Sequence, residues 1–141
     1  MAAASSKTFW RILDANFNRA KEALRVGEDF SRFLLNDKSL TSEFKKRRHD
    51  LTRILLKFPA GYEKLLMSRE SLPDVGRHQI LKDKPGNLSW KDIFCANLKR
   101  GQEAVRVLEE ISKAVSPKQS SNLQQLRFEL YDLEKRVFKK F

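Results

Sequence analysis

Apolar side chains recur every three or four residues along most of the chain, in runs that proline does not interrupt. This spacing is typical of amphipathic helices. The first helix is expected from Trp10 to Leu35, and the second from about Leu40 to Phe58 with Ser39 or Thr41 as its N-cap. No segment alternates β-branched and polar residues, so the sequence predicts an all-α fold without a sheet.

Two further helices are expected in the second half of the chain. The third begins near Ser89, where Asp92 completes a capping box, and it ends at Ser116-Pro117. The fourth follows directly, and its apolar stripe consists of Leu123, Leu126, Leu130, Leu133 and Val137. Each half of the chain therefore predicts a helical hairpin.

One helix occurs twice in the sequence. Residues 12–32, ILDANFNRAKEALRVGEDFSR, recur 81 positions later as IFCANLKRGQEAVRVLEEISK, with ten of 21 positions identical. The shared positions include polar residues that a core alone would not select: Asn16/Asn97, Arg19/Arg100, Glu22/Glu103, Arg25/Arg106 and Glu28/Glu109. The repeat suggests a site built from two related halves.

These elements predict a four-helix arrangement of two duplicated helical hairpins related by a pseudo-two-fold axis. The first repeat covers about residues 10–58 and the second about residues 90–140, with a long functional loop of about residues 59–89 between them. At 141 residues, the chain is expected to form one helical domain, residues 1–141.

The connecting loop carries chemically useful residues between Ser68 and Ser89, in the sequence SRESLPDVGRHQILKDKPGNLS. A stretch of this length without periodicity is uncommon inside a compact domain, where it is usually functional or disordered. Arg69 and Asp74 are candidate site residues, and Gly76 permits a tight turn that can point backbone N–H groups at an anion. A solvated linker between the hairpins is the other interpretation of this segment.

Charge favours anionic partners without choosing among them. The 29 basic and 18 acidic residues give a net charge of +11, which suits nucleic acid, nucleotides or phosphorylated metabolites. No apolar run is long enough to span a membrane, and the first ten residues lack the apolar middle of a secretory signal. We therefore expect a cytoplasmic protein with no membrane partner. The single cysteine, Cys95, excludes an intramolecular disulfide.

Asn16 and Asn97 fall near the centre of the apolar stripes of the two repeated helices. A buried amide needs partners, which can be a backbone group, the other asparagine or a ligand. Arg19 and Arg100 lie one turn onward at the edge of each stripe. From there a guanidinium can reach inward and bind phosphate with a bidentate fork.

Rows of glutamate and arginine follow on both repeated helices. Ordinary ion pairs three or four residues apart explain such rows in most helices. Surface pairs contribute little and drift freely, yet these residues persist in two copies that differ at about half of their positions. Carboxylates flanked by arginines are what a Mg²⁺-nucleotide site requires, so the rows are candidates for such a site.

Arg48 lies in the middle of the apolar stripe of the second helix, beside Phe44, where the second half is expected to have Leu130. An arginine in a core position is costly unless it is paired. We therefore expect it to meet Asp50, a carboxylate from another helix, or an anionic ligand. His49 and Asp50 could assist proton transfer, although a histidine on a helix surface is more often structural.

Four motifs occur in order along the chain: ILDANFNRAKEALRVGEDFSRF, KKRRHDL, SRESLPDVG and ANLKRGQEAVRVLEE. This combination resembles a small hydroxymethylpyrimidine-phosphate kinase family, which occurs alone or fused ahead of thiamine-phosphate synthase. The resemblance implies phosphorylation of 4-amino-5-hydroxymethyl-2-methylpyrimidine phosphate to the diphosphate in thiamine biosynthesis, with ATP and Mg²⁺. The chain departs from the family pattern at Arg77, where a threonine is usual, and at Glu70, where aspartate is usual.

The acceptor in that reaction is itself a phosphate, so catalysis needs positioning and charge neutralisation more than a strong base. The resemblance then implies roles for three groups of residues. Catalysis is assigned to Glu22, Arg48, Arg69, Asp74 and Glu103. Substrate and phosphate binding is assigned to Asn16, Arg19, Arg25, His49, Asp50, Gly76, Asn97, Arg100 and Arg106, and metal binding to Glu28 and Glu109.

Two other functions fit parts of the sequence. The basic run FKKRRHDLTRILLK would suit an α-helical nucleic-acid-binding module, although few aromatic residues are interleaved with it. An all-α Mg²⁺-dependent nucleotide pyrophosphohydrolase would need denser acidic pairs than the single Glu109-Glu110. Under the kinase hypothesis the partners are ATP, the pyrimidine phosphate and a separate thiamine-phosphate synthase that takes the product, and a homodimer could cover remaining apolar surface.

Overall fold

The computed structural model describes residues 6–59, 61–77, 86 and 88–141. All regular secondary structure in these ranges is helical. Five α-helices and one π-helical turn follow in the order α1 (Ser6–Asp29), η1 (Phe30–Leu34), α2 (Lys38–Leu56), α3 (Gly61–Met67), α4 (Trp90–Ser112) and α5 (Pro117–Phe138). The predicted all-α class is confirmed, and no helix in the described ranges is long and apolar enough to cross a membrane.

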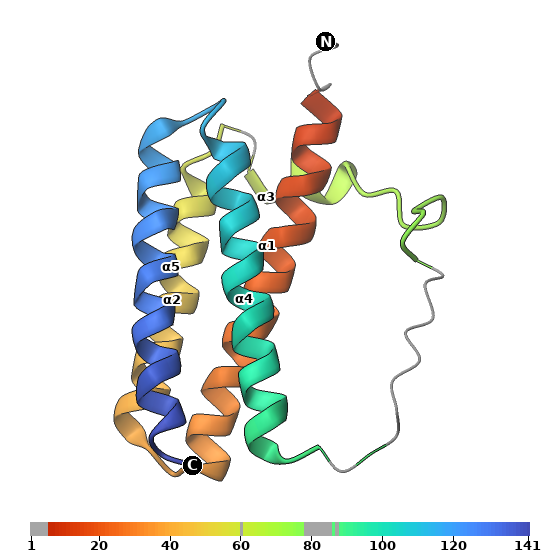
Figure 1. Ribbon diagram of the computed structural model, residues 1–141. Helices are drawn as coiled ribbons and strands as arrows, with labels where there is room; N and C mark the ends of the chain where they lie inside the picture. The colour runs from red at the N-terminus through yellow and green to blue at the C-terminus, as the bar shows by residue number, and fades with distance from the viewer. Residues whose placement is uncertain (1–5, 60, 78–85, 87) are drawn as a thin grey trace.

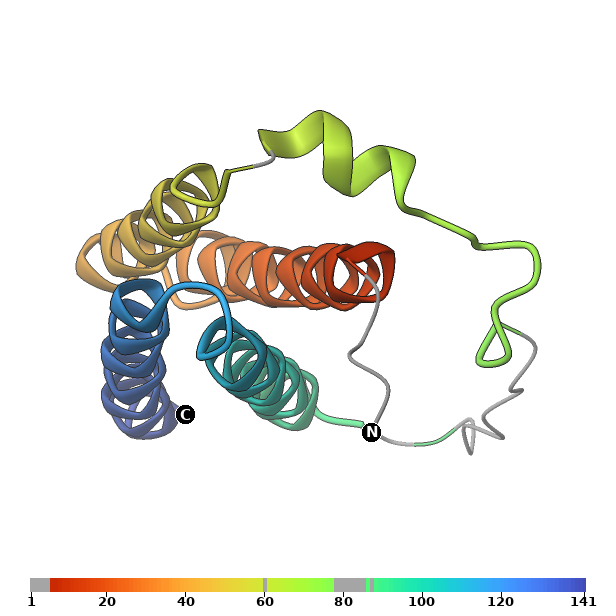
Figure 2. The same ribbon diagram turned by 90° about the horizontal axis from the view of Figure 1, so that it is seen from above.

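The four long helices pack side by side with neighbouring helices antiparallel (Figure 1). Helix α1 packs against α2 and α4, and α5 packs against α4 and α2. Seen from above, α3 lies outside this bundle, next to α1 (Figure 2). The arrangement leaves one face of the α1–α4 pair beside the segment that follows α3.

The core fills the space between the four long helices. Its largest fully buried side chains are Leu13, Leu24, Leu40, Phe44, Leu51, Leu65, Phe94, Val105, Leu108, Leu123, Leu130 and Leu133. All except Leu65, which belongs to α3, come from the four long helices whose apolar stripes the sequence predicts, and this confirms the periodicity as a guide to the core. Phe44 and Phe94 meet edge to face across the core, with 5.8 Å between ring centroids.

Two glycines allow close helix packing. A Cβ at Gly27 would lie 2.5 Å from the ring of Phe44, so only glycine leaves room for that ring against α1. A Cβ at Gly101 would lie 3.1 Å from the Cβ of Ala23, which shows how closely α1 and α4 approach each other. This close approach sets the width of the groove between these two helices.

Helix ends follow capping chemistry, with one correction to the sequence analysis. Ser89 and Asp92 form the predicted capping box at the start of α4, and Ser116 caps α5 ahead of Pro117. At the start of α2, however, the N-cap is Asp37 rather than Ser39 or Thr41. The Asp37 carboxylate accepts a 2.9 Å hydrogen bond from the Leu40 backbone N–H, and this bond lowers the pKa of Asp37.

Two segments differ from the predicted boundaries. The first predicted helix does not stay α-helical to Leu35, because it changes at Phe30 into the π-helical turn η1, in which the Leu35 N–H donates to the Phe30 carbonyl. The predicted loop of residues 59–89 contains α3, a seven-residue helix whose Leu65 is buried against the core. The short length of α3 hides its apolar periodicity.

Candidate functional site

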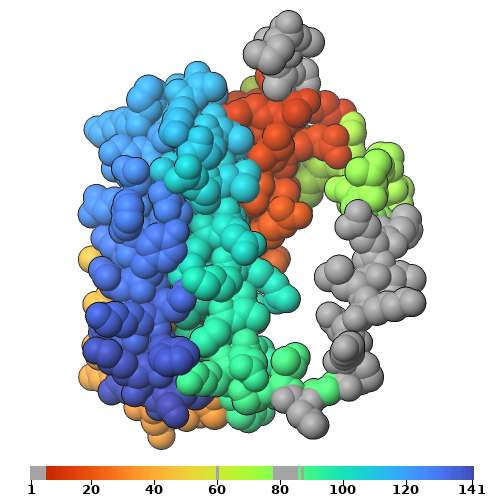
Figure 3. Space-filling model, in the orientation of Figure 1, coloured from red at the N-terminus to blue at the C-terminus, as the bar shows by residue number. Residues whose placement is uncertain are grey.

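A groove of about 440 Å³ lies between α1 and α4. Figure 3 shows these two helices side by side on one face of the molecule. The groove is lined by the polar residues of the sequence repeat, Asn16, Arg19 and Glu22 from α1 and Asn97, Arg100 and Glu103 from α4, together with Ala23, Ala104 and Val107. The structure thus brings together three of the five repeated polar pairs that the sequence singled out.

The order of these residues along the groove follows from antiparallel packing. Ala23 of α1 is level with Gly101 of α4, because their Cβ positions would nearly touch. Residues of one helix that share a face rise about 5 Å per turn. The two glutamates therefore lie near the middle of the groove, with the arginines on either side of them. The asparagines lie at the two ends.

The two asparagines are held by their own helices. Asn16 Nδ2 donates to the Ile12 carbonyl at 3.0 Å, and Asn97 Nδ2 donates to the Ile93 carbonyl at 2.9 Å. The Asn16 Oδ1 also accepts a 3.4 Å hydrogen bond from Arg19 Nη1. Each amide thus binds a backbone carbonyl, one of the partners that the sequence left open, and this bond fixes the amide where it lines the groove.

The four charged side chains in the groove have no ion-pair partner among the described residues. This holds for Arg19 and Arg100 and for Glu22 and Glu103, all of which are exposed. Most other arginines on these helices are paired, as Arg25 is with Glu28. Two guanidinium groups and two carboxylates that face one groove without forming ion pairs with described residues are available to a ligand that carries negative charge and a cation.

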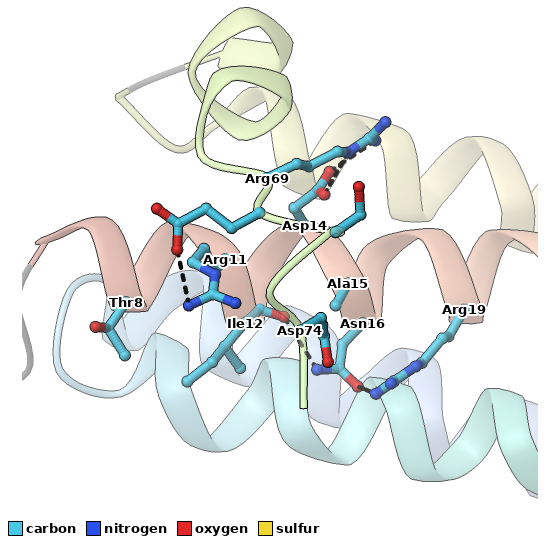
Figure 4. A pocket seen from close by; sticks show the side chains of 11 residues that line it. Thr8, Arg11, Ile12, Asp14, Ala15, Asn16, Arg19, Arg69 and Asp74 are labelled. Atoms are coloured by element: carbon cyan, nitrogen blue, oxygen red, sulfur yellow. Dashed lines mark hydrogen bonds and ion pairs between the residues drawn. The ribbon is translucent and has the colours of Figure 1, made fainter. Parts of the chain in front are cut away.

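A second cavity of about 480 Å³ adjoins the groove and shares Asn16 and Arg19 with it. Figure 4 shows its side chains, which come from the first half of α1 and from the segment that follows α3. The α1 residues are Thr8, Arg11, Ile12, Asp14, Ala15, Asn16 and Arg19, and the segment supplies Arg69, Glu70, Ser71 and Asp74. The predicted site residues Arg69 and Asp74 therefore lie next to the groove.

Asp14 fixes the position of Arg69. Arg69 Nε and Nη2 donate to the two carboxylate oxygens of Asp14 at 2.6 and 3.0 Å, and Asn18 Nδ2 adds a 3.2 Å bond to the same carboxylate. Hydrogen bonding to the buried Asp14 raises the pKa of Arg69, so the guanidinium stays charged. Asp14 was not among the predicted site residues, and the second copy of the repeat has Cys95 at its position.

Two further contacts tie the segment after α3 to α1. Glu70 forms ion pairs with Lys7 and with Arg11, the latter at 3.4 Å, and the hydrogen bond from Lys7 lowers the pKa of Glu70. Asp74 Oδ1 accepts a 2.8 Å bond from the Gly76 N–H. That N–H was expected to face an anionic ligand, but it binds the Asp74 carboxylate, and Gly76 lines neither cavity.

Residues 11–136 match the ThiD2 family. The chain belongs to this family. It is 36% identical over 131 residues to a thiamine-phosphate synthase of Rhodopirellula baltica, and 37% identical over 134 residues to one of Synechocystis sp.. These matches cover 93% and 95% of the chain but 34% and 37% of the relatives, so the chain spans about one third of their length. No solved structure gives a significant match.

Arg48 forms a mostly buried ion pair between α2 and α1 in this ThiD2 chain. Its Nε donates to Glu28 Oε2 at 3.0 Å, and the two side chains are 15% and 10% exposed. In the second half, Arg127 of α5 binds Glu109 in the same way, with Nε and Oε2 2.7 Å apart. The predicted contrast between Arg48 and Leu130 is therefore wrong, because Arg127 makes the corresponding contact and the sequence comparison had placed the last helix out of register.

Glu28 and Glu109, predicted as metal ligands, are each neutralised by an arginine from the neighbouring helix. They line neither cavity. A carboxylate that is buried against a guanidinium is needed there to offset the cost of burying that positive charge. The placement thus favours a structural role for both glutamates. Within the described ranges, no group of three or more His, Cys, Asp or Glu residues could hold a metal ion.

The remaining predicted residues lie outside both cavities. Arg25 and Arg106 are exposed and pair with glutamates of their own helices. Asp50 pairs with Arg53 at 2.7 Å, and His49 is exposed on α2. These four residues fit the alternative interpretation from the sequence, in which they are ordinary residues of a helix surface and do not bind a ligand.

Proposed function

We propose that the chain is a kinase that phosphorylates hydroxymethylpyrimidine phosphate to the diphosphate with ATP, in thiamine biosynthesis. The main support is the groove between α1 and α4, where two guanidinium groups and two carboxylates form no ion pair with any described residue. Membership of the ThiD2 family and likeness to thiamine-phosphate synthases support the pathway. The product would pass to a thiamine-phosphate synthase.

The proposed reaction transfers one phosphoryl group between two phosphates. An oxygen of the acceptor phosphate forms a bond to the γ-phosphorus of ATP. The bond from that phosphorus to the β,γ-bridging oxygen breaks, and its electron pair leaves with ADP. A phosphate dianion has no proton to lose, so the protein needs no general base for this step. Its task is to hold the two phosphates in line and to offset their charge.

Three arginines of the two cavities suit this task. Arg19 lines both cavities, Arg100 lies in the groove and Arg69 is fixed by Asp14 in the second cavity. A fixed guanidinium stabilises transferring phosphoryl oxygens without having to reorganise during the reaction. We assign to these three arginines the binding of phosphate oxygens.

Glu22 and Glu103 fit the magnesium ion that this activity implies. Both carboxylates line the groove, and neither has an ion-pair partner among the described residues. Mg²⁺ is usually held by one or two carboxylates together with substrate phosphates and water, so a larger acidic cluster is unnecessary. When bound, the ion would neutralise phosphate charge. We assign the metal to these two glutamates in place of Glu28 and Glu109.

We propose as well that α1 and α4 derive from an internal duplication, which the ten identical positions of the repeat support. The two copies supply equal sets of residues to the groove, whereas Asp14 and the segment after α3 border only its Asn16 end. A symmetric groove with a different structure at one end could distinguish a donor from an acceptor.

The test is to incubate the purified chain with ATP, Mg²⁺ and the pyrimidine monophosphate and to measure products by mass spectrometry. The diphosphate and ADP are expected in equal amounts, and neither should form without the pyrimidine phosphate. Arg53→Gln is the matched control for arginine substitutions, because Arg53 is exposed outside both cavities.

A folded protein that forms no diphosphate would reject the kinase. Release of pyrophosphate from ATP would favour the nucleotide pyrophosphohydrolase instead. Binding of DNA or RNA that weakens steeply with salt, without ATP turnover, would favour the nucleic-acid-binding module.

A further inference from the structure

We infer that the two cavities divide the substrates, with the nucleotide in the α1–α4 groove and the pyrimidine phosphate in the cavity bordered by Asp74. This inference rests on the proposed kinase function and adds which ligand each cavity takes. This assignment follows from a comparison of which arginines in each cavity already form ion pairs within the protein.

The guanidinium groups of the groove are not ion-paired with described carboxylates, so they can bind a ligand with several phosphates. Arg19 and Arg100 have no ion-pair partner among the described residues, and they lie on either side of the central glutamates. The α4 residues that line the groove run from Asn97 to Val107, which is about 15 Å of helix. An elongated polyphosphate can therefore contact several positive charges along the groove.

Two of the three arginines that line the second cavity, Arg11 and Arg69, are instead paired with carboxylates. Arg69 is bound by both oxygens of Asp14, and Arg11 is paired with Glu70. Such a cavity offers less positive charge to a triphosphate than the groove does. It suits a smaller ligand with one phosphate, which can reach Arg19 where the cavities meet.

The second cavity also has the features that an amino-substituted ring requires. Ile12 and Ala15 supply apolar surface against which a flat ring can pack. Asp74 supplies a carboxylate oxygen, Oδ2, that has no hydrogen-bond partner among the described residues, because Oδ1 alone binds the Gly76 N–H. Asp74 lines the same cavity as Asn16 (Figure 4), and Asn16 also lines the groove.

The geometry assigns to Asp74 the recognition of the ring amino group. An amino group donates hydrogen bonds and a carboxylate only accepts them, so the two are complementary. A ring with a carbonyl oxygen at that position would instead present an acceptor to an acceptor. Asp74 would therefore select the aminopyrimidine over its 4-oxo analogue.

Two variants separate the cavities. In Asp74→Asn the side-chain oxygen can keep its bond to the Gly76 N–H, and the new amide then faces the ligand's amino group with a donor. We expect the dissociation constant of the pyrimidine phosphate to rise about tenfold or more, and that of a non-hydrolysable ATP analogue to stay unchanged. Arg100→Gln should show the opposite split, because Arg100 lines only the groove.

Binding is measured by calorimetry on the full chain, since KM equals a dissociation constant only when chemistry is slow. The 4-oxo analogue serves as a second probe, and Asp74→Asn should lose most of the wild-type preference for the aminopyrimidine. Both substituted side chains are exposed, so the variants are expected to fold, and circular dichroism checks this. Arg53→Gln should match the wild type for every ligand.

The outcomes separate the inference from the function on which it rests. The wild type could be active while each variant weakens the binding of both ligands equally, or while each weakens the binding of the ligand assigned to the other cavity. Either result shows that the assignment of ligands to cavities is wrong and leaves the kinase function supported. If the wild type binds neither ligand and forms no diphosphate, the proposed kinase function is wrong, and the assignment of substrates to cavities is then wrong as well.

Discussion

The same repeated helix supplies two sets of glutamate and arginine that the structure treats in opposite ways. Glu28 and Glu109 are buried and each is bound by an arginine of a neighbouring helix. Glu22 and Glu103, two turns earlier, are exposed in a groove and have no ion-pair partner among the described residues. The two pairs of glutamates that recur in both copies thus recur for different reasons. One pair has a structural role, and the other is consistent with ligand binding.

The largest expected effect comes from breaking a buried pair. Arg48→Leu removes the closer of the two arginines that pair with the buried Glu28 carboxylate and leaves only the exposed Arg25, at 3.4 Å. We expect the free energy of unfolding to fall by about 3 kcal/mol or more, measured by urea denaturation. The double variant Glu28→Leu/Arg48→Leu should be considerably more stable than the single one, because it removes both charges.

An Arg48→Leu protein that is as stable as the wild type but inactive would break the comparison. It would return Arg48 to the ligand-binding role that the family resemblance implies. Arg127→Leu offers an independent check, because Arg127 binds Glu109 and also donates a 2.9 Å hydrogen bond to the Tyr131 hydroxyl.

The opposite behaviour is expected in the groove. Arg19→Gln removes the guanidinium that lines both cavities. Loss of one such group from a phosphoryl-transfer site should lower kcat/KM by about a hundredfold, with the melting temperature within about 2 °C of the wild type. Steady-state kinetics and a thermal melt check the two parts, with Arg53→Gln as the control. A large loss of stability with normal kinetics would place Arg19 in the structural set.

A third variant sharpens the difference between the two ends of the groove. Asp14→Cys gives the first copy the residue that the second copy has at Cys95. Arg69 then loses its carboxylate partner, so we expect binding of the pyrimidine phosphate to weaken about tenfold. The unfolding free energy should fall by only about 1 kcal/mol, because Arg69 is partly exposed and water can solvate it. Calorimetry and urea denaturation measure the two effects.

The smallest effect concerns a carboxylate whose partner is the backbone. The bond from the Leu40 N–H lowers the pKa of Asp37, so the contribution of Asp37 to stability is fully present above its unfolded pKa of about 4. That contribution is lost as the pH falls through the folded pKa. In Asp37→Asn the cap stays neutral, so its melting temperature should change less than that of the wild type between pH 5 and about pH 2. Parallel curves would show that Asp37 adds no pH-dependent stability.

Periodicity predicted most of the fold because each long helix carries an apolar stripe. The capping box at Ser89 and the proline at 117 also have local signatures, so the starts of α4 and α5 were correct, whereas α4 ends at Ser112, before the predicted Ser116-Pro117. Helix α3 was missed because seven residues are too few to show a period. The register of the last helix was misjudged, with Leu130 in place of Arg127 as the counterpart of Arg48, because spacing does not show which arginine reaches which glutamate.

Part of the candidate site could also be predicted from local sequence, and part could not. The repeat identified Asn16, Arg19, Glu22 and their counterparts, since unusual polar residues occur at equal positions of two copies. It could not separate them from Arg25 and Glu28, which recur equally well. Asp14 was missed because its role depends on Arg69, 55 residues away in the sequence.

The sequence by itself determined the helices, their apolar stripes and the set of polar residues that both copies share, because these depend on spacing within a helix. Only the tertiary structure decided which of these charges are neutralised and which stay available. That decision depends on the side chains that neighbouring helices bring within about 3 Å, and no spacing along one helix encodes them. The two copies share these polar residues, and the packing of the helices gives each of them its role.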